Sequence, residues 1–270
     1  MADLTGLHVV VTRPLAQAEP WAERLREMGA TTSIVPLLDI VPLKDAEHIQ
    51  FIKNRILDFD HYSKAIFVSQ NAVVYGLEWL ENYWPQLPYG IDYFAVGETT
   101  AKQLQQRGLP VTDLAQSQSG AMNSETLLQS PALQSVKGEK ILIFRGLGGR
   151  PHIGEVLSER GAHVDYCELY ERVLPSEASV ALNQVLARAQ TNLVVVVHSG
   201  EALENLQRVL SGLAVDLSRL KEQLVLLVPS QRILDIAIAT GFKRVHAAQN
   251  ATELCMLQGL LDVQCQFGSD

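Results

Sequence analysis

The chain has 270 residues, of which 47% are hydrophobic and 19% charged, so it can bury substantial cores and does not have the composition of a disordered chain. This length exceeds an ordinary single core and suits two domains of about 100–150 residues each. The formal net charge of −8 argues against generic nucleic-acid binding, which needs a basic surface, but leaves room for a local basic pocket that binds a small anion.

Six short apolar runs each end on a small or polar residue and are followed by an amphipathic stretch. In chain order they are His8–Pro14, Ala65–Ser69, Tyr93–Gly97, Lys140–Gly146, Leu193–Ser199 and Leu224–Ser230. Continuous apolarity predicts parallel strands that are buried on both faces. Helices are predicted from the amphipathic stretches, among them Ala18–Met28, Thr100–Gln106, Ile153–Glu159 and Ala202–Leu210. This alternation predicts an α/β class. The tail after about residue 262 has no readable role and is a candidate for disorder.

An internal repeat is the most informative feature of the chain, because residues 8–38 align with residues 140–170 without a gap. Eight positions are identical where chance gives roughly two: Arg13/Arg145, Leu15/Leu147, Glu23/Glu155, Leu25/Leu157, Glu27/Glu159, Gly29/Gly161, Ala30/Ala162 and Leu37/Leu169. A weaker similarity relates Ser69 to Ser199 and Gly97 to Ser230. The chain therefore consists of two kinds of unit, in the order A, B, A′, B′.

Two assemblies of these units are consistent with the residues. A could fold with B and A′ with B′, giving tandem domains. Alternatively, A could fold with B′ while B and A′ form an inserted domain, with two chain crossings near residues 39–42 and 171–175. Both crossings carry similar apolar segments with a proline, Leu38–Pro42 and Tyr170–Pro175, which could pair as a short ladder. That similarity mildly favours the interleaved assembly.

The standard catalytic and nucleotide-binding motifs are incomplete in this chain. In Arg145–Arg150 the G-x-G-x-x-G pattern breaks, because Pro151 takes the third glycine position, and no P-loop lysine follows. Ser199 lacks the flanking glycines of a nucleophile elbow, so it is expected to cap a helix, and the same is expected of Ser69 and Ser230. The seven histidines show no metal-ligand spacing.

What remains is a set of helix N-termini and arginines at strand carboxyl ends. The predicted helices follow Ser69, Gly97, Gly146, Ser199 and Ser230. Arginines occupy the same loops, at Arg13, Arg145, Arg150 and Arg232. Open α/β sheets bind ligands at this edge, and helix N-termini bind anions there. The alternative is a set of capped helices with solvated arginines; the agreement on one edge favours a cleft for a ligand with several carboxylates or phosphates.

Cysteine usage and the termini bear on the compartment. The three cysteines are scattered, without a C-x-x-C pair, which fits a reducing cytoplasm without disulfides or a structural zinc: Cys167, Cys255 and Cys265. The first residues lack a signal-peptide pattern, and no apolar stretch is long enough to span a membrane. We therefore expect a cytoplasmic protein with no membrane association.

A succession of segments resembles the uroporphyrinogen-III synthase family. They are Val11–Ala18, Gly29–Pro36, Phe67–Val73, Ala95–Ala101, Arg145–Arg150, Arg160–Val164, Tyr170–Arg172, Ser199–Leu203 and Ser230–Arg232. No single one is decisive, but their order is specific and covers nearly the whole chain. The loop Ser230–Ile233 departs from the glycine- and threonine-rich version of some members, and Val68 and His198 stand where threonine is common.

The resemblance implies an enzyme of tetrapyrrole (heme) biosynthesis without a cofactor, acting as a monomer. It would close linear hydroxymethylbilane with inversion of the last pyrrole and loss of water, making it a hydro-lyase. The implied fold is two parallel-sheet α/β domains joined by a two-stranded ladder, with residues 39–171 inserted between residues 1–38 and 172–270, and the active site in the cleft between them. The alternative function is a cytoplasmic two-domain binding or sensor module for an anionic metabolite.

The resemblance also implies roles for individual residues. Tyr170 matches the tyrosine proposed as the acid that assists loss of the substrate hydroxyl. The candidate substrate-binding residues are Arg13, Ser69, Asn71, Gly97, Thr100, Arg145, Gly149, Arg150, Ser199, Ser230 and Arg232. No metal is expected. His198 is expected to point away from the cleft.

Overall fold

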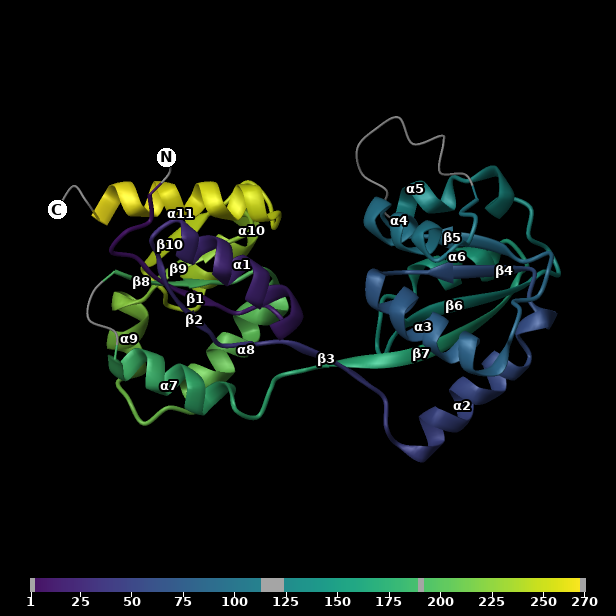
Figure 1. Ribbon diagram of the computed structural model, residues 1–270, viewed down its shortest axis with the longest axis horizontal. Coiled ribbons are helices and arrows are strands. Elements are labelled where there is room, and N and C mark those ends of the chain that lie inside the picture. The colour runs from purple at the N-terminus through teal and green to yellow at the C-terminus, as the bar shows by residue number, and fades with distance from the viewer. Residues whose placement is uncertain (1–2, 113–123, 189–191, 268–270) are drawn as a thin grey trace. The chain divides into compact units, whose positions relative to one another are not determined.

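The computed structural model describes residues 3–112, 124–188 and 192–267, which fall into two compact units (Figure 1). Unit 1 combines Met1–Ile40 with Val173–Asp270, and unit 2 is the intervening Val41–Arg172. Unit 1 is therefore discontinuous in sequence, and the chain passes between the units twice.

Unit 1 is built on a five-stranded sheet in the order β10-β9-β8-β1-β2, and its strand pairings are parallel. Its strands are β1 (His8–Val11), β2 (Thr31–Ile34), β8 (Leu193–Val196), β9 (Val225–Val228) and β10 (Arg244–Ala247). Its helices are α1 (Leu15–Glu27), α7 (Ala178–Arg188), α8 (Gly200–Ser211), α9 (Leu217–Gln223), α10 (Gln231–Ala239) and α11 (Glu253–Phe267).

Helices cover both faces of this sheet, which explains why its central strands are apolar without alternation. Helices α1 and α11 pack on one face, where Trp21 and Leu260 meet Val9 of β1. Helices α7, α8 and α10 cover the other face, where Leu182 and Leu206 join the same core as Val10. Figure 1 shows α1 and α11 on one side of the sheet and α7 and α8 on the other.

Unit 2 has a second five-stranded sheet in the order β3-β7-β6-β4-β5. Its strands are β3 (Asp39–Pro42), β4 (Lys64–Phe67), β5 (Asp92–Ala95), β6 (Lys140–Gly146) and β7 (His163–Val173). Its helices are α2 (Ala46–Leu57), η1 (Phe59–His61), α3 (Gln70–Tyr83), α4 (Glu98–Gln106), α5 (Ser124–Leu128), η3 (Pro131–Leu133) and α6 (His152–Glu159).

The core of unit 2 also lies on both sides of its sheet. On one face Leu128 of α5 and Leu157 of α6 pack with Ile143 of β6. On the other face the rings of Phe67 and Phe144 stack with their centroids 4.5 Å apart. The strands β4 and β6 are thus buried on both sides, as continuous apolar runs predict.

These sheets confirm the predicted α/β class, and each contains one copy of the repeated strand-helix-strand unit. The A copy, β1-α1-β2, lies in the same sheet as β8 and β9, whereas the A′ copy, β6-α6-β7, lies in the same sheet as β4 and β5. Strands β3 and β7, which are neighbours in the second sheet, contain the points at which the chain passes between the units. The order β2-β1-β8-β9 therefore corresponds to β7-β6-β4-β5.

All six predicted strands form, and the predicted helices begin one to three residues earlier than the hydrophobic pattern indicated. The exposed first turn of a helix carries little apolar periodicity, so the pattern misses it. The expectation of disorder after residue 262 is wrong up to Phe267, because α11 continues to that residue and buries Val263 in the core of unit 1.

Candidate functional site

The carboxyl ends of three strands of unit 2 border a pocket of about 540 Å³. Its lining includes Val68 and Val96, which directly follow β4 and β5. It also includes three of the predicted site residues, Arg145, Gly149 and Arg150. Arg172 also lines it, and Glu125 is the one carboxylate among the described lining residues. Three arginines against one glutamate make this pocket suited to an anion.

Tyr170 and Ser69 meet at the same edge of the sheet. The hydroxyl oxygen of Tyr170, on β7, lies 2.7 Å from Oγ of Ser69, so one of the two hydroxyls donates to the other. Ser69 is the N-cap of α3, and its Oγ accepts from the backbone N–H of Ala72 at 3.1 Å. Tyr170 is only 1% exposed and its ring stacks on that of Tyr75 at 5.5 Å. The hydroxyl is thus held in a fixed place by a short chain of hydrogen bonds.

Gly146 makes room for the ring of Tyr170. The pairing of β6 with β7 shifts between Arg145 and Gly146, so that Gly146 stands opposite Tyr170. A Cβ added to Gly146 would lie 2.5 Å from the ring of Tyr170, closer than two carbon atoms can approach. The irregular pairing and the absent side chain together bring the tyrosine to the end of β6.

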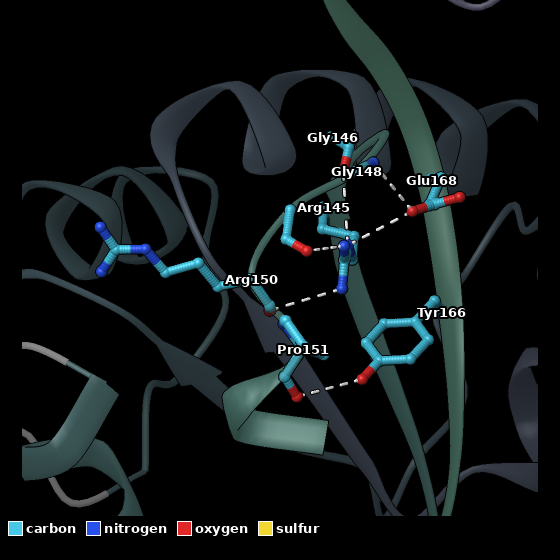
Figure 2. A network of polar contacts seen from close by, with 8 residues as sticks. Arg145, Gly146, Gly148, Arg150, Pro151, Tyr166 and Glu168 are labelled. Carbon is cyan, nitrogen blue, oxygen red and sulfur yellow. Dashed lines mark hydrogen bonds and ion pairs between the residues drawn. The ribbon is translucent and has the colours of Figure 1, made fainter. Parts of the chain in front are cut away.

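The side chain of Arg145 is bound to its own loop rather than extended to solvent (Figure 2). Its Nε donates to the carbonyl oxygen of Gly146 at 3.3 Å and lies 3.4 Å from Oε1 of Glu168. Its terminal nitrogens donate to the carbonyl oxygens of Gly149 and Arg150. The guanidinium also lies over the ring of Tyr166, 4.6 Å from the centroid. These contacts tie the loop after β6 to β7.

The other predicted site residues of unit 2 lie at the starts of α3 and α4. They are not among the described residues that line the pocket. Asn71 is half-buried in the first turn of α3. Gly97 precedes α4 with a φ of 93°, a left-handed conformation that favours glycine. Thr100 is 3% exposed and lies in α4.

In unit 1 the predicted serines again stand at helix N-termini. Ser199 caps α8 by accepting from the N–H of Ala202 at 3.1 Å, with backbone angles close to those of Ser69. Ser230 is the N-cap of α10 but makes no side-chain capping bond. Arg232, in the first turn of α10, is exposed. This edge therefore presents helix N-termini, as the sequence predicted.

Arg13 is largely engaged with protein groups. Its guanidinium lies 3.2 Å from Oε1 of Glu253 and donates to the carbonyl oxygen of Ala251 at 3.1 Å, and it lies 5.8 Å from the centroid of a Trp21 ring. The ring of His198 meets Trp21 edge-on at 5.0 Å. The loop after β1 is in this way attached to the start of α11.

His198, which the sequence marks only as a departure from the family pattern, is half-buried. Both ring nitrogens are buried and have no hydrogen-bond partner among the described residues. Burial, with the nearby charge of Arg13, lowers the pKa of His198 to about 3. A protonated ring in this place would be costly, so the side chain is neutral at physiological pH.

The described ranges contain no cluster of three or more metal-ligating side chains, and the three cysteines are free. Among the helices that the structure describes, none is both long and apolar enough to cross a membrane.

Comparison with known proteins gives consistent matches. The family model described as uroporphyrinogen-III synthase HemD matches residues 19–258. The uroporphyrinogen-III synthase of Escherichia coli K12 is 32% identical over 94% of this chain and 100% of its own length. That of Salmonella typhimurium LT2 is 30% identical, again over 94% of this chain and 100% of its own length.

Solved structures resemble the fold. A mutant uroporphyrinogen III synthase from Thermus thermophilus aligns with a TM-score of 0.60 and 18% identity, covering 97% of this chain and 100% of that one. Uroporphyrinogen-III synthetase from Helicobacter pylori 26695 aligns with a TM-score of 0.57 and 17% identity, covering 97% of this chain and 99% of that one. At these identities the likeness concerns the fold.

Proposed function

The chain belongs to the uroporphyrinogen-III synthase family, and from this membership we propose how its own residues carry out the reaction. Its activity is that of a uroporphyrinogen-III synthase, a hydro-lyase of tetrapyrrole biosynthesis. The substrate that the family implies is linear hydroxymethylbilane, which is closed with inversion of the last pyrrole ring and loss of water. The alternative of a sensor module is set aside, because the relatives that match along the chain are synthases.

The main task assigned to the protein is to hold a flexible, reactive substrate in one conformation. Hydroxymethylbilane carries acetate and propionate groups on all four pyrroles and can close without the enzyme to the uninverted isomer. A rigid arrangement of anion-binding groups favours the conformation in which the substituted carbon of the last pyrrole attacks. The 540 Å³ pocket lies at the start of α6 and is lined by Arg150 and Arg172. These features support a role for the pocket in binding some of the substrate carboxylates.

Tyr170 is proposed as the acid that assists departure of the substrate hydroxyl. The substrate hydroxyl receives the proton of the Tyr170 hydroxyl as the carbon–oxygen bond of the substrate breaks, and the oxygen leaves as water. The observation that carries this proposal is the 2.7 Å contact between the hydroxyls of Tyr170 and Ser69. If Ser69 donates, it stabilises the negative charge that develops on the Tyr170 oxygen and leaves the tyrosine proton free for the substrate. Ser69 can donate because its oxygen accepts separately from Ala72.

We further propose that both units contribute groups that bind the substrate. Helix N-termini after Ser199 and Ser230, with Arg232 beside them, are the groups of unit 1 suited to the remaining carboxylates. Gly97, Asn71 and Thr100 would support the edge of unit 2. The proposed active form is a cytoplasmic monomer that needs no cofactor.

The test is to supply freshly prepared hydroxymethylbilane and resolve the product isomers. The wild-type protein is expected to yield predominantly isomer III, in which the last pyrrole is inverted, rather than the uninverted isomer I. Tyr170→Phe is expected to form isomer III about 100-fold more slowly, within the usual range for a lost general acid. Tyr62→Phe is the matched control, since Tyr62 is also buried and donates to Asp165 at 2.9 Å, but in a different part of unit 2.

The two variants separate catalysis from stability. Both remove a buried hydrogen bond and are expected to lower the free energy of unfolding by about 1 kcal/mol, measured by urea titration. Only Tyr170→Phe is expected to change the rate of isomer III formation. Unchanged turnover in Tyr170→Phe would remove this residue from the mechanism, and isomer I as the sole wild-type product would contradict the proposed function.

A further inference from the structure

Arg145 is a buried cation whose hydrogen bonds go to the protein. Its side chain is 8% exposed although it belongs to the lining of the 540 Å³ pocket. Each of its three nitrogens donates to a carbonyl oxygen of the loop after β6, at Gly146, Gly149 or Arg150. Figure 2 shows the guanidinium between the backbone of Arg150 on one side and the carboxylate of Glu168 on the other.

The loop 146–151 is fastened to β7 at several points besides Arg145. The N–H of Gly148 donates to Oε1 of Glu168 at 3.3 Å, and the N–H of Leu147 donates to the carbonyl oxygen of Tyr170 at 2.7 Å. The hydroxyl of Tyr166 donates to the carbonyl oxygen of Pro151 at 3.3 Å. Four carbonyl oxygens of this loop are therefore bound by side chains of β6 and β7: those of Gly146, Gly149 and Arg150 by Arg145, and that of Pro151 by Tyr166.

This loop is the element that connects the pocket with Tyr170. At one end Gly146 lies against the ring of Tyr170, and at the other Gly149 and Arg150 line the pocket. Carbonyl oxygens that faced the pocket would repel a carboxylate, whereas the positive charge of a bound guanidinium offsets that repulsion. The position of one guanidinium therefore affects both the anion pocket and the surroundings of the tyrosine.

We propose that Arg145 is a positioning residue for the synthase reaction, which holds loop 146–151 with its carbonyl oxygens turned away from substrate and Gly146 against Tyr170. This inference rests on the function proposed above and assigns Arg145 a role other than binding substrate carboxylates. Arg150, five residues further on, has the opposite character: it is exposed, and in Figure 2 its guanidinium extends away from the network. Arg150 is the arginine of this loop suited to bind substrate.

The experiment compares Arg145→Ala with the matched variant Arg150→Ala, using steady-state kinetics with hydroxymethylbilane and the ratio of isomers III and I. Arg145→Ala is expected to lower kcat about tenfold or more with a smaller change in KM. It is also expected to release a larger share of isomer I, because displacement of loop 146–151 misaligns the bound substrate. Arg150→Ala is expected to raise KM more than it lowers kcat. If Arg145→Ala raises KM alone, as a lost carboxylate ligand would, the proposal is wrong.

A second measurement reports on the loop without any turnover. Amide hydrogen exchange of residues 147–150 in the free protein is expected to accelerate about tenfold in Arg145→Ala and to stay at the wild-type rate in Arg150→Ala. Unchanged exchange in Arg145→Ala contradicts the proposal even if activity falls. This readout also separates the two hypotheses, since an active Tyr170→Phe would refute the acid while leaving the loop result intact.

Glu168→Gln covers the case in which Arg145→Ala does not fold. The amide keeps the shape of the side chain but removes the charge beside the guanidinium and weakens the acceptor for the N–H of Gly148. It is expected to change kcat, isomer ratio and loop exchange in the same direction as Arg145→Ala, by about threefold or more. Wild-type behaviour of Glu168→Gln in all three measurements would overturn the proposal.

Discussion

The buried ring of His198 gives unit 1 a predictable response to acid. Its pKa is lowered to about 3 in the folded protein, against an ordinary value of 6.5. Between these values the unfolded chain binds a proton that the folded chain does not, so the free energy of unfolding falls as the pH falls from about 6.5 toward 3. The loss is about 2 kcal/mol at pH 5, since each pH unit below 6.5 costs about 1.4 kcal/mol.

His198→Leu is expected to remove this contribution. Its free energy of unfolding relative to wild type should rise by about 2 kcal/mol between pH 7 and pH 5, measured by urea titration at both pH values. The comparison with wild type is needed because burial also lowers the pKa values of His8 and His246. His61→Leu is the control, because it makes the same replacement at an exposed site and leaves the buried ring in place. An equal pH dependence of wild type and His198→Leu would contradict the expectation.

Single residues show where sequence reasoning reached its limit. That a serine between strand and helix caps the helix is a local property, and it was predictable at Ser69 and Ser199. Whether an arginine in a glycine-rich loop faces ligand or protein depends on its partners across the sheet. Glu168 and Tyr166 lie some twenty residues after Arg145, and no local pattern indicates that they hold its guanidinium. The same holds for the ring of His198, whose contact with Trp21 no local pattern indicates.

At the scale of secondary structure, the repeat provides a pair of nearly identical helix starts. Ser69→Ala and Ser199→Ala each remove a capping bond of 3.1 Å, from α3 and α8, which is expected to cost about 1 kcal/mol of stability. Ser69→Ala also removes the bond to Tyr170, which adds about 1 kcal/mol. Ser230→Ala, at a helix start without a side-chain capping bond, is expected to cost least.

Denaturant titration of these three variants checks the order, and the isomer assay adds a functional readout. Ser69→Ala is expected to slow isomer III formation more than its stability loss explains, because Tyr170 loses its hydroxyl partner. Equal stability losses for Ser69→Ala and Ser199→Ala would show that the bond between the two hydroxyls contributes nothing to folding.

The strands were predictable because burial on both faces leaves a continuous apolar run, as in β1, β4, β6 and β8. The interleaving was visible only as a preference, since the sequence similarity of A to A′ says which units are alike but not which ones pair. The shift in pairing between Arg145 and Gly146 could not be predicted. Glycine at position 146 reads as an ordinary turn residue until the ring of Tyr170 is placed opposite it.

At the scale of the whole molecule, the two units differ in continuity, and this predicts how fragments behave. Residues 41–172 contain β4 to β7 and their helices, so this fragment is expected to fold cooperatively by itself. Residues 173–270 alone lack β1, which lies beside β8 within the sheet of unit 1. That fragment would expose the apolar edge of β8 and is expected to aggregate.

Circular dichroism and size-exclusion chromatography of the two fragments test this expectation. Adding a peptide of residues 1–40 should rescue the fragment 173–270, because it supplies β1, α1 and β2. A monomeric, cooperatively folded 173–270 without the peptide would contradict the expectation.

The discontinuity of unit 1 also has a consequence in time while the chain is being synthesised. β1 ends at Val11 and its partner β8 begins at Leu193, so at about 5–20 residues per second the first strand waits roughly 10–40 s for its neighbour on the ribosome. Unit 2 is complete before β8 emerges and is expected to fold first. The apolar strand β1 and its helix α1 therefore remain without their sheet throughout that interval. The amino-terminal segment is thus expected to be the part of the nascent chain that most needs a chaperone.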